Sequence, residues 1–452
     1  MILTAYRYAD LSEREVERLC ARPAGLDGAV LAAVEAIERE VRADGDDALH
    51  ALNARYDTPV DALRVPAGRL GEAWTAADPS FRDAVETAGA NLRAFHAPQR
   101  PVAYRVEPMP GVRLWRETRP VERAGLYVPG GTAPLVSTLL MTAIPAQIAG
   151  CPRIVVCTPP PAAEGVLAVA GFLGLDEVYQ VGGAQAVFAL AYGTETVPRV
   201  DLIAGPGNAY VAAAKWRASR VCAVDLVAGP SEVLIIADEA ADPDWIAADL
   251  LAQAEHGADS QVVLLTTDAA MVERVQNALS EQLADLPRRE TAKRALARSF
   301  AVVTDTLEDA VAFSDRYAPE HLILNVTDWA PLAASVSNAG SVFCGALTPE
   351  SVGDYASGTN HTLPTAGFAR STSGLTVERF LRTVTFQALD EDGLGALAPA
   401  VTTLARAEGL EAHARAVTLR QETLSSRAKR SDLVGTDGMA SPPSRGPLRS
   451  SQ

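Results

Sequence analysis

Hydrophobic and polar positions follow different periods in different parts of this 452-residue chain. Over about the first 120 residues, apolar side chains recur at the spacing of one helix face. Examples are Val30, Val34, Ile37 and Val41. Pro and Gly then cluster around residues 99–111, which indicates a connection. The pattern therefore predicts a mainly helical N-terminal part.

Beyond that connection, short runs rich in β-branched residues alternate with helical stretches. Strands are predicted at 153–157, 177–181, 200–204, 232–237, 261–265, 301–304, 322–326 and 341–344. Helices are predicted between them at 164–173, 184–192, 209–218, 268–283, 307–314 and 328–336. Such alternation is typical of parallel sheets covered by helices. Because the strands form two successive sets, we expect two α/β halves.

The expected fold class is α/β, with two Rossmann-like parallel-sheet domains and small helical extensions at both ends. We place the first α/β domain at 27–126 plus 233–375 and the second at 127–232. The extensions are predicted at 1–26 and 376–424. Residues 425–452 are rich in Ser, Pro, Gly and Arg with few apolar side chains, so we expect a disordered tail.

Charge and cysteine content narrow the class of partner. Lys and Arg number 40 against 56 Asp and Glu, a net charge of −16, which argues against nucleic acid. A phosphate-bearing cofactor stays possible, because helix N-termini bind phosphate without basic side chains. Five scattered cysteines without a C-x-x-C pair favour reduced thiols over disulfides or a thiolate zinc site. With no secretory signal or membrane-length apolar run, we expect a cytoplasmic protein without a membrane partner.

A helix is predicted over residues 242–257, with an N-cap Asp and a Pro at its start and a Gly at its end. Ile246 and Leu250 lie one turn apart on the face that should be buried. Gln253 and His256 continue this stripe with polar groups, and burying them unpaired would cost about 1–3 kcal/mol each. Either internal hydrogen bonds satisfy them, or the amide oxygen and the imidazole bind a metal.

Two further segments carry candidate chemistry. Glu320 and His321 stand directly before the predicted strand at 322–326, where a carboxylate and an imidazole could act as a general acid/base pair or form an ordinary surface pair. Residues 349–361 predict a long loop of small polar residues. In it, Asp354 and His361 are either ligands or substrate contacts, or a turn-forming Asp and a solvent-facing His.

Three glycine-rich turns stand beside predicted strands, at 130–131, 182–183 and 205–208. The last is a G-x-G between a strand and a helix, as in dinucleotide sites. The third glycine of that fingerprint is replaced by Tyr210, and Asp225 is only an ambiguous candidate for the acidic residue that follows it. A standard Rossmann fingerprint is therefore absent, and any dinucleotide would bind in a variant manner.

These segments together resemble the histidinol dehydrogenase family, from about residue 100 to 420 and more loosely in the N-terminal helices. The matching strings are Val121–Gly131, Val181–Ala186, Gly205–Asn208, Ala228–Val233, Gln253–Gly257, Pro319–His321, Gly353–His361, and Glu408 with His413. So many ordered matches at the family's spacing make the resemblance specific. Of the six histidines, only His50 and His96 fall outside these strings.

The resemblance implies a zinc ion and a homodimer. The zinc ligands would be Gln253, His256, Asp354 and His413. His413 and Glu408 would come from the partner subunit, so that 376–424 would be a dimerisation unit. Nitrogen and oxygen ligands without thiolate suit a zinc that keeps open positions for substrate.

The resemblance also implies the oxidation of L-histidinol to L-histidine by two NAD, through bound L-histidinaldehyde, at the end of histidine biosynthesis. His321 would take the alcohol proton, and Glu320 would activate water for the second oxidation. The substrate would contact Ser231, Glu408, His361 and His321 as well as the zinc ligands. NAD would contact Tyr127, Gln185 and Asn208 in the second α/β domain.

Three other readings of the sequence remain open at this point. The chain could be an NAD-linked dehydrogenase of another small polar alcohol on the same scaffold. It could be a zinc hydrolase in which Glu320 activates a metal-bound water. A binding protein without catalysis is the third, and the density of acid, base and ligand residues argues against it. Neither dehydrogenase interpretation needs a thiol. We therefore predict that Cys151 and Cys344 can each be replaced by Ala or Ser with activity largely kept.

Overall fold

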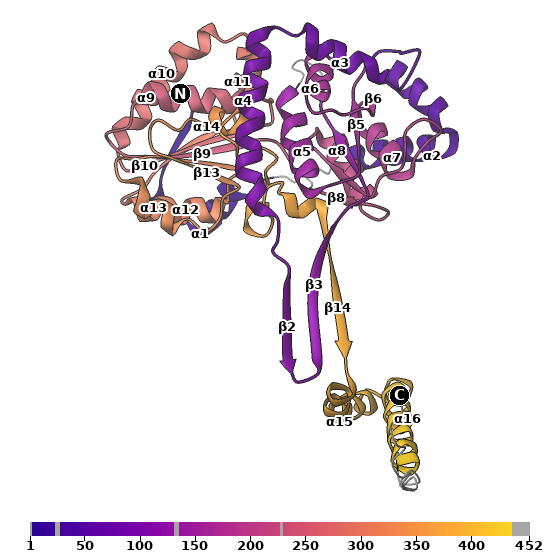
Figure 1. Cartoon of the computed structure of the whole chain (residues 1–452). Helices are drawn as coiled ribbons and strands as arrows, with labels where there is room; N and C mark the ends of the chain where they lie inside the picture. Colours follow the sequence, from indigo (N-terminus) through magenta and orange to yellow (C-terminus); the bar gives the residue numbers. More distant parts are fainter. Residues whose placement is uncertain (1, 23–27, 131–134, 227–228, 436–452) are drawn as a thin grey trace, which may run out of the picture. The chain divides into compact units, whose positions relative to one another are not determined.

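The computed structural model describes residues 2–22, 28–130, 135–226 and 229–435. The chain divides into two compact units (Figure 1). The first comprises Met1–Arg100 and Pro120–Arg382, and the second comprises Pro101–Arg119 and Thr383–Gln452. No helix in the described ranges combines the length and the apolar character needed to cross a membrane.

The first unit contains two sheets, and every strand pairing described in them is parallel. The larger has the order β1-β11-β10-β9-β12-β13. Its strands are β1 (Thr4–Arg7), β9 (Glu232–Ala237), β10 (Gln261–Thr266), β11 (Phe300–Val303), β12 (His321–Asn325) and β13 (Ser341–Cys344). The smaller has the order β6-β5-β4-β7-β8. Its strands are β4 (Arg123–Tyr127), β5 (Arg153–Thr158), β6 (Val178–Gln180), β7 (Leu202–Ala204) and β8 (Ala223–Val224).

Both sheets repeat one connectivity. If β1 is set aside, the strands of each sheet stand in the order third, second, first, fourth, fifth, which is the doubly wound pattern. The predicted α/β class with two Rossmann-like sheets is thereby confirmed. The strand order reverses between β4 and β7 in one sheet and between β9 and β12 in the other. Open sheets of this kind bind ligands beside such switch points.

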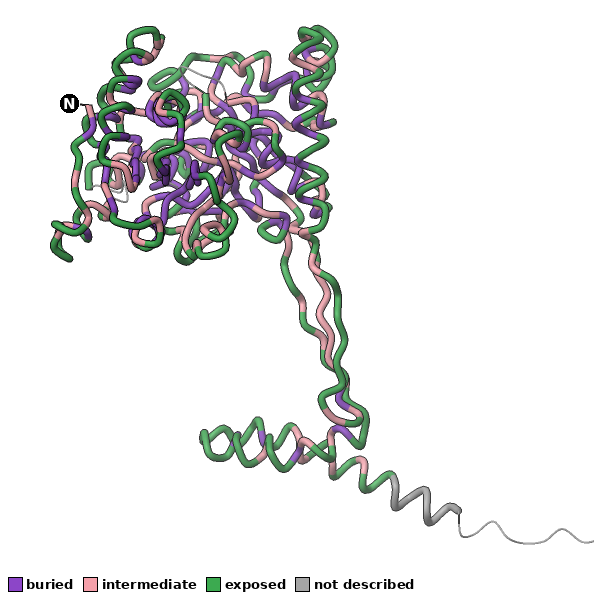
Figure 2. The backbone as a smooth tube through the Cα atoms, turned by 90° about the vertical axis from the view of Figure 1, so that its left-hand side faces the viewer, coloured by how far each residue is buried: buried purple, intermediate pink, exposed green. Residues whose placement is uncertain are grey.

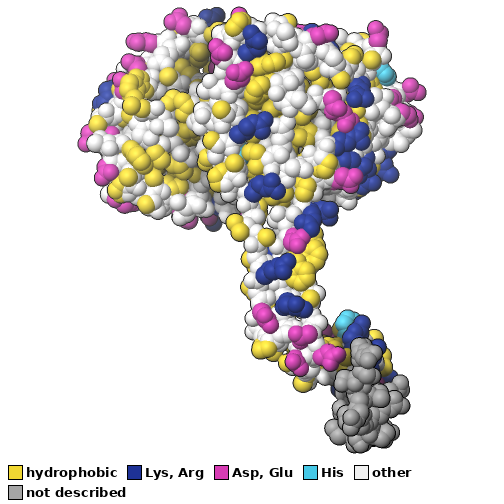
Figure 3. Space-filling view, in the orientation of Figure 1, with side chains coloured by type: hydrophobic (Ala, Val, Ile, Leu, Met, Phe, Trp, Pro, Cys, Tyr) yellow, Lys and Arg dark blue, Asp and Glu magenta, His cyan; other side chains and the backbone are white. Residues whose placement is uncertain are grey.

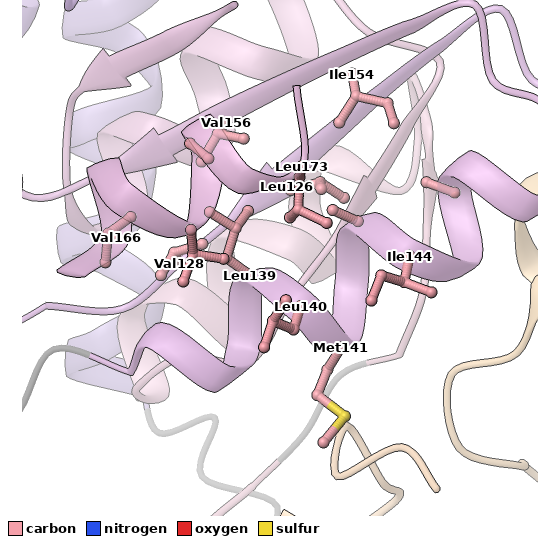
Figure 4. Close-up of a cluster of buried hydrophobic side chains, with 14 of the residues drawn as sticks. Leu126, Val128, Leu139, Leu140, Met141, Ile144, Ile154, Val156, Val166 and Leu173 are labelled. Carbon is pink, nitrogen blue, oxygen red and sulfur yellow. The ribbon is translucent and has the colours of Figure 1, made fainter. Parts of the chain in front are cut away.

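Helices cover the sheets and create the core. Those of the five-stranded sheet are α5 (Val136–Ala149), α6 (Glu164–Phe172), α7 (Gly183–Tyr192) and α8 (Ala209–Ala218). Those of the six-stranded sheet are α9 (Pro243–Ala254), α10 (Ala269–Asp285), α11 (Arg289–Leu296), α12 (Leu307–Tyr317) and α13 (Trp329–Ser335). Figure 4 shows how Leu126 of β4 packs near Leu139 and Ile144 of α5; all three are fully buried. Each such side chain stabilises the fold by about 1.5–3 kcal/mol.

A layer of N-terminal helices packs on the five-stranded half. It consists of α2 (Gly28–Tyr56), α3 (Ala67–Ala76) and α4 (Pro79–His96). α2 contacts α7 and α8, α3 contacts α6, and α4 contacts α5. The predicted first domain, which grouped residues 27–126 with 233–375, does not match these contacts, because the N-terminal helices pack on the five-stranded half. The predicted boundary at 126–127 also fails, because it cuts β4, the central strand of the five-stranded sheet. The helical period of α2 predicts that one face is buried, but it does not identify the surface that covers this face.

The two ends of the chain also differ from the expected helical extensions. The N-terminal segment begins with β1, which pairs with β11 and forms one edge of the six-stranded sheet. α1 (Glu13–Cys20) follows. At the other end, α16 (Glu411–Gly435) continues through the described part of the predicted disordered tail. Its Ala, Arg, Glu and Leu content favours a helix despite the loss of an apolar face. Residues 436–452 lie outside the described part of the chain.

The second unit combines a small sheet with two helices. Its strands have the order β14-β3-β2, with β2 (Tyr104–Met109) antiparallel to β3 (Val112–Pro120), and β14 is Leu381–Leu389. The rings of Trp115 and Phe386 stack across it, 5.1 Å apart. α15 (Glu391–Ala407) and α16 follow. The predicted helical unit at 376–424 thus also contains a strand, and Figure 2 shows that this unit is far less buried than the interior of the first.

Candidate active site

A cavity of about 350 Å³ lies between the two sheets of the first unit. One wall follows the carboxyl ends of β4 and β7, through Pro129 and the turn at 206–208. The opposite wall follows the amino ends of β9 and β12, through Ser231 and residues 320–321. The cavity is therefore bordered by the switch point of the five-stranded sheet and by the amino ends of two strands of the six-stranded sheet, and its volume suits a small molecule.

The structure brings together most of the residues predicted for the site. Those that line the cavity are Asn208, Ser231, Gln253, His256, Glu320, His321, Asp354 and His361. Tyr127 and Gln185 are buried in the five-stranded half, and neither is among the lining residues. Glu408 and His413 are exposed residues of the second unit, at the end of α15 and in α16.

Glu320 and His321 are both held by the main chain of Glu232, the first residue of β9. The N–H of Glu232 donates to Oε2 of Glu320 at 2.8 Å. Nδ1 of His321 lies 3.0 Å from the carbonyl oxygen of Glu232. Because a carbonyl can only accept, Nδ1 carries the proton, and in the neutral ring Nε2 keeps its lone pair. This Nε2 is buried at the cavity without a hydrogen-bond partner among the described residues, and it lies 3.6 Å from Oδ1 of Asp354.

The end of α12 places this pair at the cavity. Ala318 follows the helix in the left-handed conformation, with φ of 52°, and its N–H donates to the carbonyl oxygen of Ser314. Pro319 then prevents the helix from resuming. The chain turns directly into β12, whose first residue is His321. A non-glycine residue at positive φ is unusual, and here it accompanies a buried polar pair.

Carboxylates outnumber cations around His321. Its Nε2 lies 3.6 Å from Oδ1 of Asp354, and its Nδ1 lies 3.8 Å from Oε1 of Glu350. Burial alone would lower the pKa of His321, but Glu350, Glu320 and Asp354 outweigh it and raise this pKa to about 10. Burial raises the pKa of Glu320 to about 8, against the opposing charge of His321. No Lys or Arg in the described ranges forms an ion pair with these three carboxylates.

The same carboxylates form a cluster suited to a cation. Donor atoms of His256, Glu350 and Asp354 all lie within 4.8 Å of one another. Gln253 is fully buried beside Glu350, and its amide is satisfied only in the orientation that turns the nitrogen toward this carboxylate. In that orientation the nitrogen donates to both oxygens of Glu350, at 3.2 Å to Oε2. This assignment leaves the amide oxygen of Gln253 free to face a metal. Excess negative charge, an imidazole and a free amide oxygen are the donor chemistry that zinc accepts.

Glu350 was missed by the sequence analysis. Residues 349–361 were predicted as a loop, but α14 (Glu350–Tyr355) forms within them. Because Glu350 and Asp354 are four residues apart, this single helical turn places both carboxylates on one face. The spacing of the two acids was the available signal. A six-residue helix containing Gly353 is too short to show an apolar period.

His361 contacts the site from the segment after α14. Its Nδ1 donates to the carbonyl oxygen of Asp354 at 2.9 Å, and its Nε2 lies 3.3 Å from Oγ1 of Thr138. Burial lowers the pKa of His361. A neutral ring with Nδ1 protonated can accept a hydrogen bond at Nε2, which faces the cavity wall formed by α5.

The five-stranded half contributes polar groups of a different kind. Gln185 is 2% exposed, and its Nε2 has no hydrogen-bond partner among the described residues. The hydroxyl oxygen of Tyr127 accepts from the N–H of Gly183 at 3.1 Å. The side-chain oxygen of Asn208 caps α8 by accepting from the N–H groups of residues 210 and 211, which leaves its amide nitrogen available.

A buried ion pair fixes the turn at 205–208. Gly205 has φ of +123°, and a Cβ there would meet the carbonyl oxygen of Tyr127 at 2.1 Å. Its N–H donates to Oδ2 of Asp225, and its carbonyl oxygen accepts from Lys215, each at 2.8 Å. Lys215 and Asp225 are themselves paired and almost fully buried. Asp225 is thus committed to this turn and is not the ribose-binding acid of a Rossmann fingerprint.

Together, the doubly wound sheets and the cavity between them define an α/β protein with a small-molecule site that contains acid, base and metal-ligand groups. The family model described as histidinol dehydrogenase matches residues 21–421 of the chain. The chain belongs to the histidinol dehydrogenase family, as the resemblance of its motifs implied.

Individual relatives agree over nearly the whole length. Histidinol dehydrogenase of Vibrio vulnificus (strain CMCP6) is 49% identical over 425 residues, covering 93% of this chain and 99% of that protein. The enzyme of Shigella sonnei (strain Ss046) is 48% identical over 416 residues, covering 91% and 96%. The crystal structure of histidinol dehydrogenase from Elizabethkingia anophelis superposes with a TM-score of 0.89 at 41% identity, covering 94% of this chain and 99% of that one.

Proposed function

We propose that this protein oxidises L-histidinol to L-histidine through bound L-histidinaldehyde, with reduction of two NAD. The observation that carries the proposal is the buried Nε2 of His321 at the wall of the cavity, beside Glu320 and Asp354, in a chain of this family. A role in histidine biosynthesis and the expected cytoplasmic location follow from this activity. A zinc hydrolase is not favoured, because the relatives are dehydrogenases.

In the first oxidation, Nε2 of His321 takes the hydroxyl proton while the carbon gives a hydride to NAD. Each alcohol thereby loses two electrons and two protons and becomes an aldehyde. The carboxylates around His321 favour its protonated form, and a cation bound at Asp354 would offset part of their charge. In the neutral ring, the hydrogen bond from Nδ1 to Glu232 keeps the lone pair of the base on the cavity side. Enclosure between the two sheets would keep the aldehyde from leaving before it reacts again.

In the second oxidation, Glu320 takes a proton from the water that adds to the aldehyde. The resulting hydrate gives a second hydride to a second NAD and a hydroxyl proton to the acid/base pair, and it becomes the carboxylic acid. Glu320 is suited to pass protons near neutral pH, because burial raises its pKa to about 8. Its carboxylate is fixed by the N–H of Glu232, beside His321, so the two groups can divide the proton transfers.

Zinc dependence is part of the proposal. Gln253, His256 and Asp354 would hold the ion, and His413 from a second copy would complete the set. Bound zinc would orient the substrate and polarise its oxygen. Two observations support this set. The residues lie in a cluster with excess negative charge. Glu350 accepts hydrogen bonds from the amide nitrogen of Gln253, which leaves the amide oxygen available to the metal.

Coenzyme and substrate contacts complete the proposal. Tyr127, Gln185 and Asn208 would contact NAD; the unpartnered nitrogen of Gln185 and the available nitrogen of Asn208 support this. Ser231 and His361 would contact the substrate from the cavity wall, together with Glu408 of a second copy.

A homodimer is proposed because Glu408 and His413 belong to the second unit. Apolar side chains are exposed on that unit, which supports association: Tyr104, Val106, Leu404 and Leu410 are 43–65% exposed. Several hydrophobic side chains are also visible along its strands in Figure 3.

The test is to count NADH formed per L-histidinol consumed by the zinc-loaded protein. A ratio near two, lost in His321→Asn by about 10²–10⁴-fold in rate, would support the reaction and the base. A ratio of one or no NADH would contradict it. For the dimer, the inactive variants His413→Ala and His321→Asn are mixed after mild unfolding. Recovery of activity on mixing supports a site shared by two chains, and no recovery argues against it.

A further inference from the structure

The five-stranded sheet lacks an acidic residue where doubly wound dinucleotide sites usually have one. In those sites, an Asp or Glu at the end of the second strand binds the adenosine ribose. The corresponding strand here is β5, which ends at Thr158 and is followed by three prolines, at 159–161. Asp225, the other candidate, is committed to Lys215 and Gly205. The ribose carboxylate is therefore missing from the strand itself.

A carboxylate from the N-terminal helix layer occupies this position. A Cβ built on Gly182 would lie 2.7 Å from Oδ2 of Asp57 and 2.9 Å from Cβ of Pro159. Asp57, the residue that follows α2, thus meets the end of β5 and the turn before α7 at one point. Gly182 and Pro159 flank the carboxyl ends of β6 and β5, which is the edge where dinucleotides bind.

The main chain holds Asp57 firmly in this place. Its N–H donates to the carbonyl oxygen of Asn53, and the buried side chain of Asn53 donates to the carbonyl oxygen of Gln180 in β6, both at 2.9 Å. Downstream, the N–H of Gln180 donates to Leu63 at 2.7 Å, and the N–H of Val65 donates to Val178 at 2.9 Å. The segment that carries Asp57 is therefore tied to β6 on both sides.

The carboxylate of Asp57 has no partner of its own. No hydrogen bond or ion pair to its side chain occurs within the described ranges, and the only influence on its pKa is partial burial, which raises it. The same charge contributes to raising the pKa of Tyr127, whose hydroxyl meets Gly183. An exposed carboxylate without a cation, close to Tyr127 and to the carboxyl ends of β5 and β6, is suited to hydroxyl donors of a ligand.

We infer that Asp57 accepts hydrogen bonds from the adenosine ribose of NAD and excludes the 2′-phosphate of NADP. The inference rests on the proposed use of NAD and adds a residue that selects the coenzyme. A ribose diol supplies two hydroxyl donors to a carboxylate, whereas a 2′-phosphate would bring negative charge against it. The acidic residue of the dinucleotide-binding fingerprint thus comes from the segment after α2 and not from the end of β5.

The test compares Asp57→Ala, Asp57→Asn and Asp57→Glu with the control Asp61→Asn, an exposed acid four residues away. Kd for NAD is measured by calorimetry, and kcat and KM are measured with NAD and NADP. We expect Asp57→Ala and Asp57→Asn to raise Kd and KM for NAD about tenfold, the strength of one hydrogen bond to a charged group, with kcat within about twofold. The preference for NAD over NADP should fall by at least about tenfold, and Asp57→Glu should retain part of it.

Two results would overturn the inference: unchanged NAD affinity and coenzyme preference in folded Asp57→Ala, or equal changes in Asp61→Asn. Melting temperature identifies variants that are merely unfolded, and Asp57→Asn preserves the shape of the side chain. If the wild-type protein binds NAD but does not reduce it with histidinol, the proposed reaction fails while the role of Asp57 is still measured by Kd. If it does not bind NAD at all, both fail.

Discussion

His321 donates from Nδ1 to the carbonyl oxygen of Glu232, 3.0 Å away. The N–H of the same Glu232 donates to Glu320, so one residue at the start of β9 orients both members of the acid/base pair. The register of the sheet makes this possible, because β9 and β12 are neighbours and His321 lies opposite Val233. The orientation of the pair therefore depends on where the first residue of β9 is held.

The side chain of Glu232 is anchored by Arg22, and we predict that Arg22→Met disturbs both stability and catalysis. The two form a buried pair at 2.7 Å, and the guanidinium also lies 3.6 Å over the ring of Tyr317. Removing Arg22 leaves a buried carboxylate unpaired, which should lower the free energy of unfolding by about 3–5 kcal/mol. We expect kcat to fall more than KM changes, since β9 positions the base. Denaturant unfolding and steady-state kinetics measure the two effects.

The matched control for Arg22 is Arg316→Ala. Arg316 pairs with Glu13 at the surface, where both side chains are substantially exposed. Such a pair contributes less than about 1 kcal/mol. If Arg316→Ala lowers the free energy of unfolding as much as Arg22→Met does, removing any arginine from this region weakens the fold. Burial of the Arg22–Glu232 pair would then not be the cause.

Glu350 is predicted to set zinc affinity by holding the amide of Gln253. In Glu350→Ala, that amide loses its acceptor and can rotate, so the affinity for zinc should fall about 10–100-fold. Glu350→Gln keeps an acceptor oxygen and should lose less. Competition with a chromophoric chelator measures the affinity without relying on turnover. The exposed Glu308→Ala serves as control, and equal affinities in all four proteins would contradict the role.

The strands of the sheets could be predicted because burial on both faces leaves a continuous apolar run. β9 and β13 were predicted with their observed bounds, at 232–237 and 341–344. The partner of α2 could not be predicted, since an apolar stripe fits any apolar surface. β2 and β3 were missed because they belong to a unit of low burial, where the period of two is weak.

The site was predictable only where sequence neighbours act together. Glu320 and His321 are adjacent, so their pattern could be read directly. The helix predicted over 242–257 ends at Ala254, so Gln253 lies on α9 and His256 lies in the turn that follows it. Glu350 depended on a short helix that carries no apolar period. Arg22 and Asp57 reach the site through contacts across the fold, and these pairings become visible only when the sheets are assembled.

No thiol is predicted to take part in either oxidation. Neither Cys151 nor Cys344 is among the residues that line the cavity. Burial raises the pKa of Cys151 to about 12 and also raises that of Cys344, which disfavours a nucleophilic thiolate. Cys151→Ala and Cys344→Ala should each keep activity within about twofold, with two NADH per histidinol. A ratio that falls to one in either variant would show that its thiol serves the second oxidation.

Asp249 lies on α9 one turn before Gln253, and its carboxyl group is predicted to make the stability of the fold depend on pH. Asp249 is 9% exposed, and burial raises its pKa to about 6. Between the ordinary pKa of Asp and pH 6, the unfolded chain has lost this proton while the folded chain keeps it. The contribution of Asp249 to stability therefore falls as the pH rises through this window and stays constant above it.

Asp249→Asn removes this titration and keeps the shape of the side chain. We expect the variant to match the wild type near pH 4 and to exceed its free energy of unfolding by about 3 kcal/mol above pH 6, the equivalent of the pKa shift. Denaturant unfolding at pH 4.5 and 7.5 measures the difference. The exposed Asp285→Asn should stay within about 0.5 kcal/mol of the wild type at both pH values. A gain for Asp249→Asn that is the same at both pH values would show that a charge-independent contact, rather than burial of the carboxylate, is responsible.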